Sequence, residues 1–209
     1  MKQRIVLTLL ALSLAISLAG CGGSGSSGSA GSAGSAGSSG NGTQVDLRDG
    51  VEYEEGGASG YLGDVMHTAF MNFAITDAYT CPTYGSYTPA EGNKVLVVSV
   101  SILNTGVSSL PMFDTDFQIQ WGSENEEDYG WPITTDEEPW EHQPQAAEAL
   151  DDNQLPGEYE IGINKERSGL LFFEVPADSK DYSISFEEYF EDETVGDLYF
   201  VYFTAGEKA

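Results

Sequence analysis

Residues 94–106 read KVLVVSVSILNTG, and this stretch decides the fold class. Valine and isoleucine are branched at Cβ, which favours the pleated backbone of a strand. The asparagine and glycine near its end are turn-forming residues, because both tolerate the positive φ that a tight turn can require. The stretch therefore predicts a strand over 94–103 that is closed by a turn at 104–106.

Six further segments have the apolar runs or the alternation of apolar and polar residues that are typical of strands. They cover residues 71–79, 117–121, 159–163, 169–175, 182–186 and 198–203. Turn residues separate them, and no segment has the period of a convincing amphipathic helix. Seven short strands in this arrangement are typical of an antiparallel β-sandwich, which we expect to span residues 61–206.

Three segments also carry a resemblance to a known family. They are EGNKVLVVSVSILNTG (91–106), FDTDFQIQW (113–121) and LPGEYEIGINKERSGLLFFEVPADSKDYSISFEE (155–188). Together they resemble the telokin-like family of bacterial lipoprotein domains of unknown function. The matching positions are Asn104, Gly106, Asp116, Phe117, Pro156, Gly157, Phe173, Val175 and Pro176. The resemblance implies an immunoglobulin-like fold and an extracytoplasmic location, and it brings no catalytic residues.

The N-terminus is predicted to be a lipoprotein signal peptide of residues 1–20. Lys2 and Arg4 precede an apolar run at 5–16 that is too short to be a comfortable membrane span. Residues 18–21 read LAGC and resemble the bacterial lipobox, whose cysteine is acylated and becomes the mature N-terminus. We expect Cys21 to carry the lipid, with chains such as palmitate, and to hold the protein at the cell membrane, facing the extracellular or cell-wall side. The alternative is a secreted protein with an unmodified cysteine.

Residues 21–60 are predicted to be a disordered linker behind the lipidated cysteine. Residues 22–42 contain only glycine, serine, alanine and asparagine, so they have no side chain that could drive folding. A flexible coil of this length has a root-mean-square span of roughly 25 Å, which would let a domain stand away from the membrane. Residues 43–60 are interpreted as a continuation of this linker.

The strong acidity of the chain limits the partners it can have. It holds 34 acidic and 8 basic residues, which gives a formal net charge of −26. Phosphate backbones and anionic lipid headgroups would be repelled, so we expect no nucleic acid partner and no membrane contact besides the lipid on Cys21. Cations or a basic envelope or extracellular protein remain compatible with this charge.

The residue types that usually carry catalysis are sparse. Cys81 is the one cysteine besides Cys21, so it has no intrachain disulfide partner, and we interpret it as a partly buried free thiol. His67 and His142 lack companions at metal-ligand spacing, and the sequence contains no HExxH, CxxC or GxSxG motif. We therefore expect no enzymatic activity and no cofactor.

The acidic segment 122–155 is the unusual region, because it mixes many carboxylates with Tyr129, Trp131 and Trp140. One interpretation is a solvated, self-repelling loop face. A second is weak Ca²⁺ coordination, for which Asp136, Glu137 and Glu138 are the candidate ligands. A third is a partner surface in which the three aromatic residues anchor a basic protein that the acids attract.

The sequence thus predicts a membrane-anchored extracytoplasmic lipoprotein with an immunoglobulin-like domain that binds a ligand or a protein. The alternative is a passive structural or spacer lipoprotein without a specific ligand.

Overall fold

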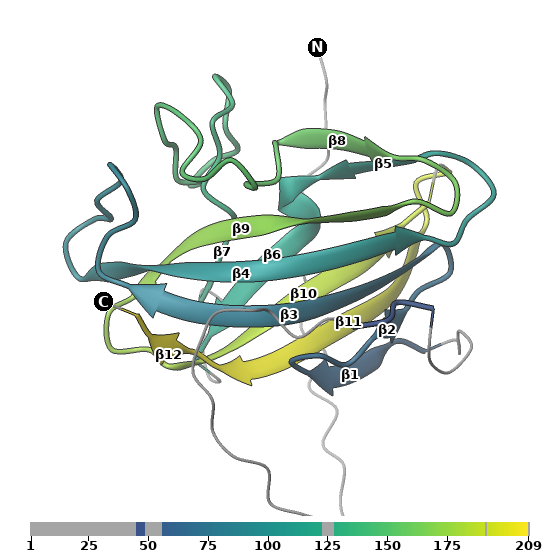
Figure 1. The fold of residues 1–209 in the computed structure, drawn as a ribbon, viewed down its shortest axis with the longest axis horizontal. Helices are drawn as coiled ribbons and strands as arrows, with labels where there is room; N and C mark the ends of the chain where they lie inside the picture. Colours follow the sequence, from purple (N-terminus) through teal and green to yellow (C-terminus); the bar gives the residue numbers. More distant parts are fainter. Residues whose placement is uncertain (1–44, 49–55, 123–127, 191, 209) are drawn as a thin grey trace, which may run out of the picture. The chain divides into compact units, whose positions relative to one another are not determined.

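A computed structural model describes residues 45–48, 56–122, 128–190 and 192–208. Two sheets pack face to face in these residues, and a short two-stranded sheet lies beside them (Figure 1). Sheet I has the order β1 (Ala58–Tyr61), β11 (Val195–Thr204), β10 (Asp181–Tyr189), β6 (Phe117–Trp121), β7 (Tyr129–Gly130). Sheet II has the order β12 (Gly206–Glu207), β3 (Met71–Cys81), β4 (Asn93–Asn104), β9 (Glu166–Pro176), with β2 (Met66–His67) paired to β3. The short sheet consists of β5 (Leu110–Phe113) and β8 (Glu158–Ile161), and a 3₁₀ turn at Asp114–Asp116 leads into β6.

The expected all-β sandwich is confirmed, and each of the seven expected strands is present. Residues 94–103 form the body of β4, which pairs antiparallel with β3 and β9 at the centre of sheet II. The main pairings are antiparallel, whereas the edge strands β1 and β12 pair in parallel with β11 and β3. One detail differs: β8 ends at Ile161, and Ile163 is 49% exposed in the turn that follows.

The main core lies between the two sheets and is rich in aromatic rings. Phe73 of β3 is fully buried and packs against Phe117 of β6 and Phe186 of β10, with ring centroids 5.5 Å and 5.6 Å apart. These residues alternate along their strands with outward-facing ones, so each strand sends one set of side chains into the core. The alternation visible in the sequence therefore marks the side chains that pack between the two sheets.

Strand β4 is buried on both faces. Its consecutive residues Val95, Leu96, Val97 and Val98 are all fully buried, because a second apolar cluster covers the outer face of sheet II. This cluster joins strand residues of sheet II to side chains from the loops above them: Cys81, Val95, Val97, Phe172, Ile133 and Ala146. The segment after β7 thus packs against the outer face of sheet II and covers it.

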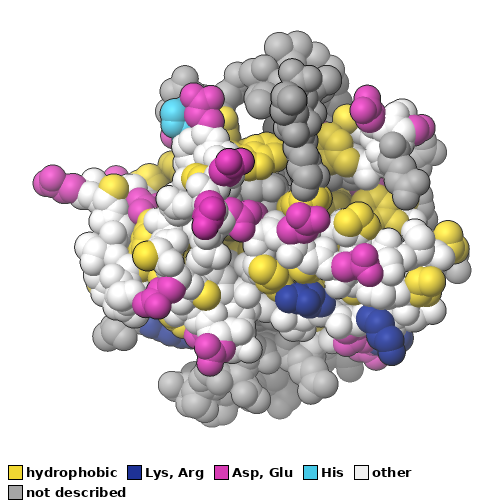
Figure 2. Space-filling view, turned by 90° about the horizontal axis from the view of Figure 1, so that it is seen from above, with side chains coloured by type: hydrophobic (Ala, Val, Ile, Leu, Met, Phe, Trp, Pro, Cys, Tyr) yellow, Lys and Arg dark blue, Asp and Glu magenta, His cyan; other side chains and the backbone are white. Residues whose placement is uncertain are grey.

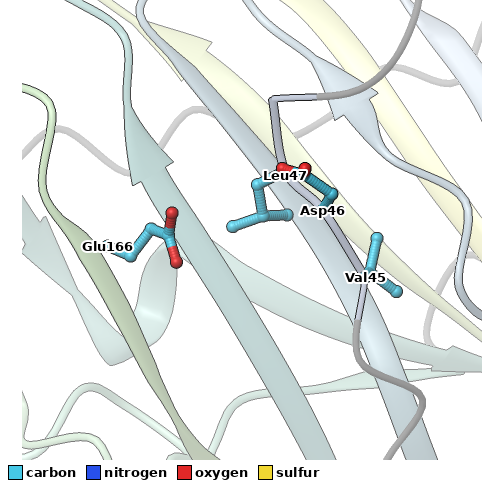
Figure 3. Close-up of a pocket in the computed structure, with 4 residues that line it drawn as sticks. All are labelled: Val45, Asp46, Leu47 and Glu166. Atoms are coloured by element: carbon cyan, nitrogen blue, oxygen red, sulfur yellow. The ribbon is translucent and has the colours of Figure 1, made fainter.

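The domain also includes residues that were predicted to belong to the linker. Leu47 is buried in a third cluster with Ala74 and Leu103, and the amide of Asn72 donates a hydrogen bond to the Leu47 carbonyl at 2.8 Å. Residues 45–47 and Glu166 line an open surface pocket in which the side chains of Leu47 and Glu166 point toward each other (Figure 3). Strand β1 likewise begins at Ala58, before the expected boundary at residue 61. Residues 45–48 and 58–60 therefore belong to the sandwich. Their contacts are with residues far away in the sequence, so the local composition could not predict them.

Candidate functional site

The three aromatic residues singled out in the acidic segment lie together in the structure. Tyr129 lies in β7, Trp131 follows that strand directly, and Trp140 comes from the next loop. The rings of Tyr129 and Trp131 are 6.2 Å apart at 80°, and those of Trp131 and Trp140 are 5.7 Å apart at 60°. Tyr129 is 44% exposed and Trp140 is 41% exposed, with Trp131 half-buried between them. We call these three residues the aromatic cluster.

Gln143, which the sequence did not mark, holds the aromatic cluster in place. Its backbone N–H donates to the Trp140 carbonyl at 3.0 Å, and its side-chain oxygen accepts from the Trp140 N–H at 3.1 Å. Its buried amide donates to the Pro132 carbonyl at 3.0 Å and to Asp114 at 3.4 Å. The loop that carries Trp140 is thereby tied to the residues that follow Trp131. A glutamine in a polar loop gives no local signal of this role.

Backbone hydrogen bonds fasten the same segment to sheet II. The Ile133 N–H donates to the Phe172 carbonyl at 2.6 Å, and the Leu155 N–H donates to the Leu170 carbonyl at 2.9 Å. Ile133, Ala146 and Leu155 of this segment are buried, so it is not a solvated loop throughout, although Asp136, Glu137, Glu138 and Glu141 are exposed. Figure 2, which views the molecule of Figure 1 from above, from the side on which these loops lie, shows acidic side chains among hydrophobic ones. Three further acids of the segment, Glu124, Glu126 and Glu127, lie outside the described residues.

A buried carboxyl group, that of Asp114, accepts a hydrogen bond from Gln143. Asp114 is 4% exposed, and burial, reinforced by the nearby Asp136 carboxylate, raises the pKa of Asp114 to about 7. The Asp136 carboxylate lies so close to Gly157 that a Cβ at this glycine would collide with it. The absence of a Cβ at Gly157 permits this close approach, and an added Cβ would displace the exposed Asp136 side chain.

The raised pKa of Asp114 predicts a pH-dependent stability. The folded state holds the proton more tightly than the unfolded chain does, so this contribution is complete near pH 4 and disappears as the pH rises through about 7. We expect Asp114→Asn to raise the free energy of unfolding at pH 8 by at least about 2 kcal/mol and to change it little at pH 4. Urea unfolding at both pH values measures the difference. The exposed Asp152→Asn is the control, and an equal gain from both variants would mean that only net charge matters.

The other sequence candidates are not brought into a reactive arrangement. Asp136, Glu137 and Glu138 are exposed, and among the described residues no three His, Cys, Asp or Glu side chains lie where they could share a metal ion. Cys81 is buried, which raises the pKa of its thiol and disfavours the reactive thiolate. His142 is exposed in a loop.

The predicted anchor lies outside what can be described. Cys21 and the signal peptide fall in residues 1–44, so their roles stay predictions. None of the helical turns in the described ranges is long and apolar enough to cross a membrane.

These features define a class of protein: an all-β sandwich domain with an aromatic surface cluster supported by packed acidic loops. The chain belongs to the family described as "Domain of unknown function (DUF4352)", whose model matches residues 61–195. No curated protein matches the sequence significantly.

Three solved structures are similar to this chain. A candidate lipoprotein, ycdA, from Bacillus subtilis is 20% identical with a TM-score of 0.47, over 68% of this chain and 38% of that chain. An uncharacterised β-sandwich protein from Clostridium difficile 630 is 13% identical with a TM-score of 0.41, over 75% of this chain and 100% of that chain. The yjhA protein from Bacillus subtilis is 13% identical with a TM-score of 0.44, over 68% of this chain and 96% of that chain. The matched region thus spans less than half of the ycdA protein.

Proposed function

We propose that this protein is a lipid-anchored surface lipoprotein whose sandwich domain binds a basic protein through the aromatic cluster. The single observation that carries the binding proposal is the convergence of Tyr129, Trp131 and Trp140 into contacting, partly exposed rings. The LAGC stretch at residues 18–21 supports the anchor, because a lipobox cysteine would receive two or more acyl chains and these suffice for stable membrane attachment.

Aromatic side chains at the centre of an interface contribute large contact areas with little loss of conformational entropy. The segment that carries the cluster also holds carboxylates, which would attract a positively charged partner over several ångströms. Lysine and arginine side chains can in addition lie over the faces of Trp and Tyr rings. The nearby acids in the described residues are Asp128, Asp136, Glu137, Glu138 and Glu141.

A passive spacer would not need this arrangement. A domain that only occupies space in the wall zone gains nothing from partly exposed tryptophan rings, since exposed apolar surface favours unwanted association. The buried hydrogen bonds of Gln143 also fix the loop that presents Trp140, and fixing a loop lowers the entropy that binding would cost. Both features favour a binding module over a spacer.

The binding proposal is tested with a short arginine-rich peptide and the full chain made without lipid by Cys21→Ser. We expect Trp140→Ala to weaken binding at physiological salt by about tenfold, because the variant removes an anchoring ring but no charge. Ile163→Ala is the matched control, since it removes a similarly exposed apolar side chain elsewhere. Fluorescence titration measures both affinities. If Trp140→Ala binds as tightly as the control, the attraction is only electrostatic and the aromatic cluster is not the site.

The anchor is tested separately in a bacterial host. We expect Cys21→Ser to move the protein from the membrane fraction to the medium or the periplasm, or to stop its processing, because no acyl chain can then be attached. A variant that is still processed and remains in the membrane fraction would show that another segment holds the protein there.

A further inference from the structure

Two neighbouring loops at one corner of the sandwich contain no acidic residue. The β4–β5 loop at 105–109 reads TGVSS, and the β8–β9 loop at 162–165 reads GINK. Both loops leave the sandwich on the side that lies to the right in Figure 1. In a chain with 34 acidic residues, the single charge of these two loops is the positive one of Lys165. We call them the corner loops.

Asn104 holds the corner loops side by side. Its side-chain amide donates to the carbonyl of Ser108 in one loop and to that of Ile161, directly before the other loop, each at 2.8 Å. Its backbone carbonyl accepts a hydrogen bond from the Asn164 N–H at 3.1 Å. The corner loops therefore form one joint surface.

This surface presents apolar side chains to the solvent. Val107 is 96% exposed and Ile163 is 49% exposed. Neither of them belongs to an apolar cluster in the part of the chain that the structure describes. A single exposed apolar residue needs no explanation, but two of them on adjacent loops without acids indicate a surface that something apolar can contact.

The chain enters the sandwich beside the same loops. Leu47 is buried on the outer face of sheet II against Leu103, two residues before the β4–β5 loop. Arg48 forms an ion pair with Glu166, the first acid after the β8–β9 loop, and donates a hydrogen bond to the Asn164 carbonyl at 3.5 Å. Figure 3 shows how closely Leu47 and Glu166 approach each other at this point. The segment that precedes Val45 is thus joined to the sandwich at the corner loops.

We propose that the corner loops contact the surface of the bilayer to which the lipid on Cys21 attaches the protein. The inference rests on the proposed lipid anchor. Valine and isoleucine side chains can enter the boundary between headgroups and acyl chains, and Lys165 is attracted by anionic headgroups. The net charge predicts that the domain as a whole is repelled from such a bilayer. The same repulsion acts on each acidic part separately, so it turns the part without acids toward the membrane.

The place where the chain enters also favours this corner over the opposite end of the sandwich. Strand β4 has 12 residues, so sheet II is about 40 Å long. The predicted linker has a root-mean-square span of roughly 25 Å, which is shorter than the sheet. The corner loops would therefore stay nearer to the bilayer than the β3–β4 loop at the far end. A contact too weak to hold a free domain can persist here, because the anchor keeps the loops at a high local concentration beside the lipid.

The acidic β10–β11 hairpin lies at the same end of the sandwich but belongs to sheet I. Its Phe190 ring lies 5.9 Å from that of Phe70, whose carbonyl accepts a hydrogen bond from the Thr105 N–H. The exposed Asp192 and Glu193 of this hairpin would be repelled by anionic lipid. The contact would therefore tilt the domain toward the corner of sheet II.

This orientation would keep the aromatic cluster away from the bilayer. Tyr129 of the cluster pairs with Gln120 of β6, and the next residue of β6, Trp121, pairs with Tyr182 near the start of β10. The acidic hairpin follows the other end of β10. The aromatic cluster thus lies toward the end of the sandwich opposite to the corner loops, where a partner could reach it.

The contact is tested with a fluorescent label on the lipid-modified full chain. Val107→Cys and Ser86→Cys are each purified from host membranes, labelled with an environment-sensitive thiol-reactive dye, and placed in vesicles of phosphatidylethanolamine and phosphatidylglycerol with brominated acyl chains. Ser86 is exposed in the β3–β4 loop at the opposite end of sheet II. The introduced cysteine takes the label, because Cys81 is buried and acylation would block the thiol of Cys21. We expect bromine to quench at least about half of the fluorescence at position 107 and little at position 86, because side chains in contact would reach the acyl boundary.

Two charge variants test the cause of the quenching. Ile163→Glu, in the chain labelled at position 107, should remove most of the quenching, because a carboxylate disfavours entry into the lipid and is repelled by its headgroups. Thr88→Glu adds the same charge at an exposed position of the β3–β4 loop and should leave the quenching unchanged. Both positions are exposed, so the fold is retained in each variant.

The possible outcomes separate this contact from the anchor. A chain that does not sediment with the vesicles would overturn the anchor and the contact together. A chain that sediments, but whose labels at positions 107 and 86 are quenched equally, would overturn the contact alone, as would quenching that Ile163→Glu does not reduce. A label at position 107 with blue-shifted emission but no quenching would show that protein and not lipid covers the corner loops, which also overturns the contact.

Discussion

Phe172→Ala is expected to lower the free energy of unfolding by about 3–5 kcal/mol, although its ring lies on the outer face of a sheet. Phe172 is fully buried beneath the loops that follow β7, and its ring packs edge-on against Tyr84 with centroids 4.7 Å apart. The alanine variant leaves a cavity under Ile133, the residue whose backbone bonds to position 172. Denaturant unfolding measures the loss, and tryptophan fluorescence reports whether the loop carrying Trp140 loosens with it.

Phe190→Ala is the matched control, because the Phe190 ring is 38% exposed and loses less contact on truncation. We expect this variant to cost about 1 kcal/mol or less. A Phe172→Ala variant that is no less stable than the control would show that the acidic segment does not cover sheet II. The aromatic cluster would then rest on a mobile loop, which would weaken the case for a pre-formed binding surface.

Asn104→Ala is expected to be comparably damaging, with a loss of about 3–4 kcal/mol, because one buried side chain satisfies three backbone groups. The Asn104 amide donates to the carbonyls of Ser108 and Ile161, each at 2.8 Å, and its oxygen accepts from the Gly106 N–H at 2.8 Å. These bonds tie the end of β4 to the short sheet of β5 and β8. Thermal or denaturant unfolding of the variant gives the loss directly.

Asn104→Asp tests the direction of these hydrogen bonds. The aspartate has almost the same shape, but its carboxylate cannot donate to the two carbonyls and is repelled by them. We expect this variant to lose as much stability as Asn104→Ala at neutral pH and to recover part of it at acidic pH, where the carboxyl group is protonated. Asn153→Ala, at an exposed position, serves as the control. An Asn104→Asp variant as stable as the natural protein at neutral pH would contradict the assigned bonds.

At Asn104 the sequence motif marks the end of the strand correctly, but the physical reason for the asparagine differs from the expected one. The Asn-x-Gly motif predicts a turn whose residues tolerate positive φ, but neither Asn104 nor Gly106 has a backbone in that region. Asn104 has the backbone conformation of a strand residue, and its side-chain amide donates the hydrogen bonds that stabilise this end of β4. A Cβ at position 106 would lie 3.2 Å from the Asn104 side-chain oxygen and 3.4 Å from the Phe70 carbonyl, so the glycine leaves room for the hydrogen bonds of Asn104.

The strands and the class of fold were determined by the sequence itself, because the alternation of side chains between two faces is a local property of the chain. Seven segments could be assigned in this way, and the one rich in Val and Ile lies at the centre of sheet II. The three rings of the aromatic cluster could also be chosen from composition, since tryptophan is rare among carboxylates. Their contact could not be predicted, because it depends on hydrogen bonds that Gln143 makes to residues 3 and 11 positions away.

Only the tertiary structure decided what covers each sheet. The burial of Leu47 and the raised pKa of Asp114 both result from contacts between residues far apart in the chain. The local sequence does not show these contacts: Leu47 is one apolar residue in a polar stretch, and Asp114 is one of many carboxyl groups in the chain. Periodicity tells which side chains share a face, but whether that face meets water, another sheet or a loop depends on free energies summed over the whole fold.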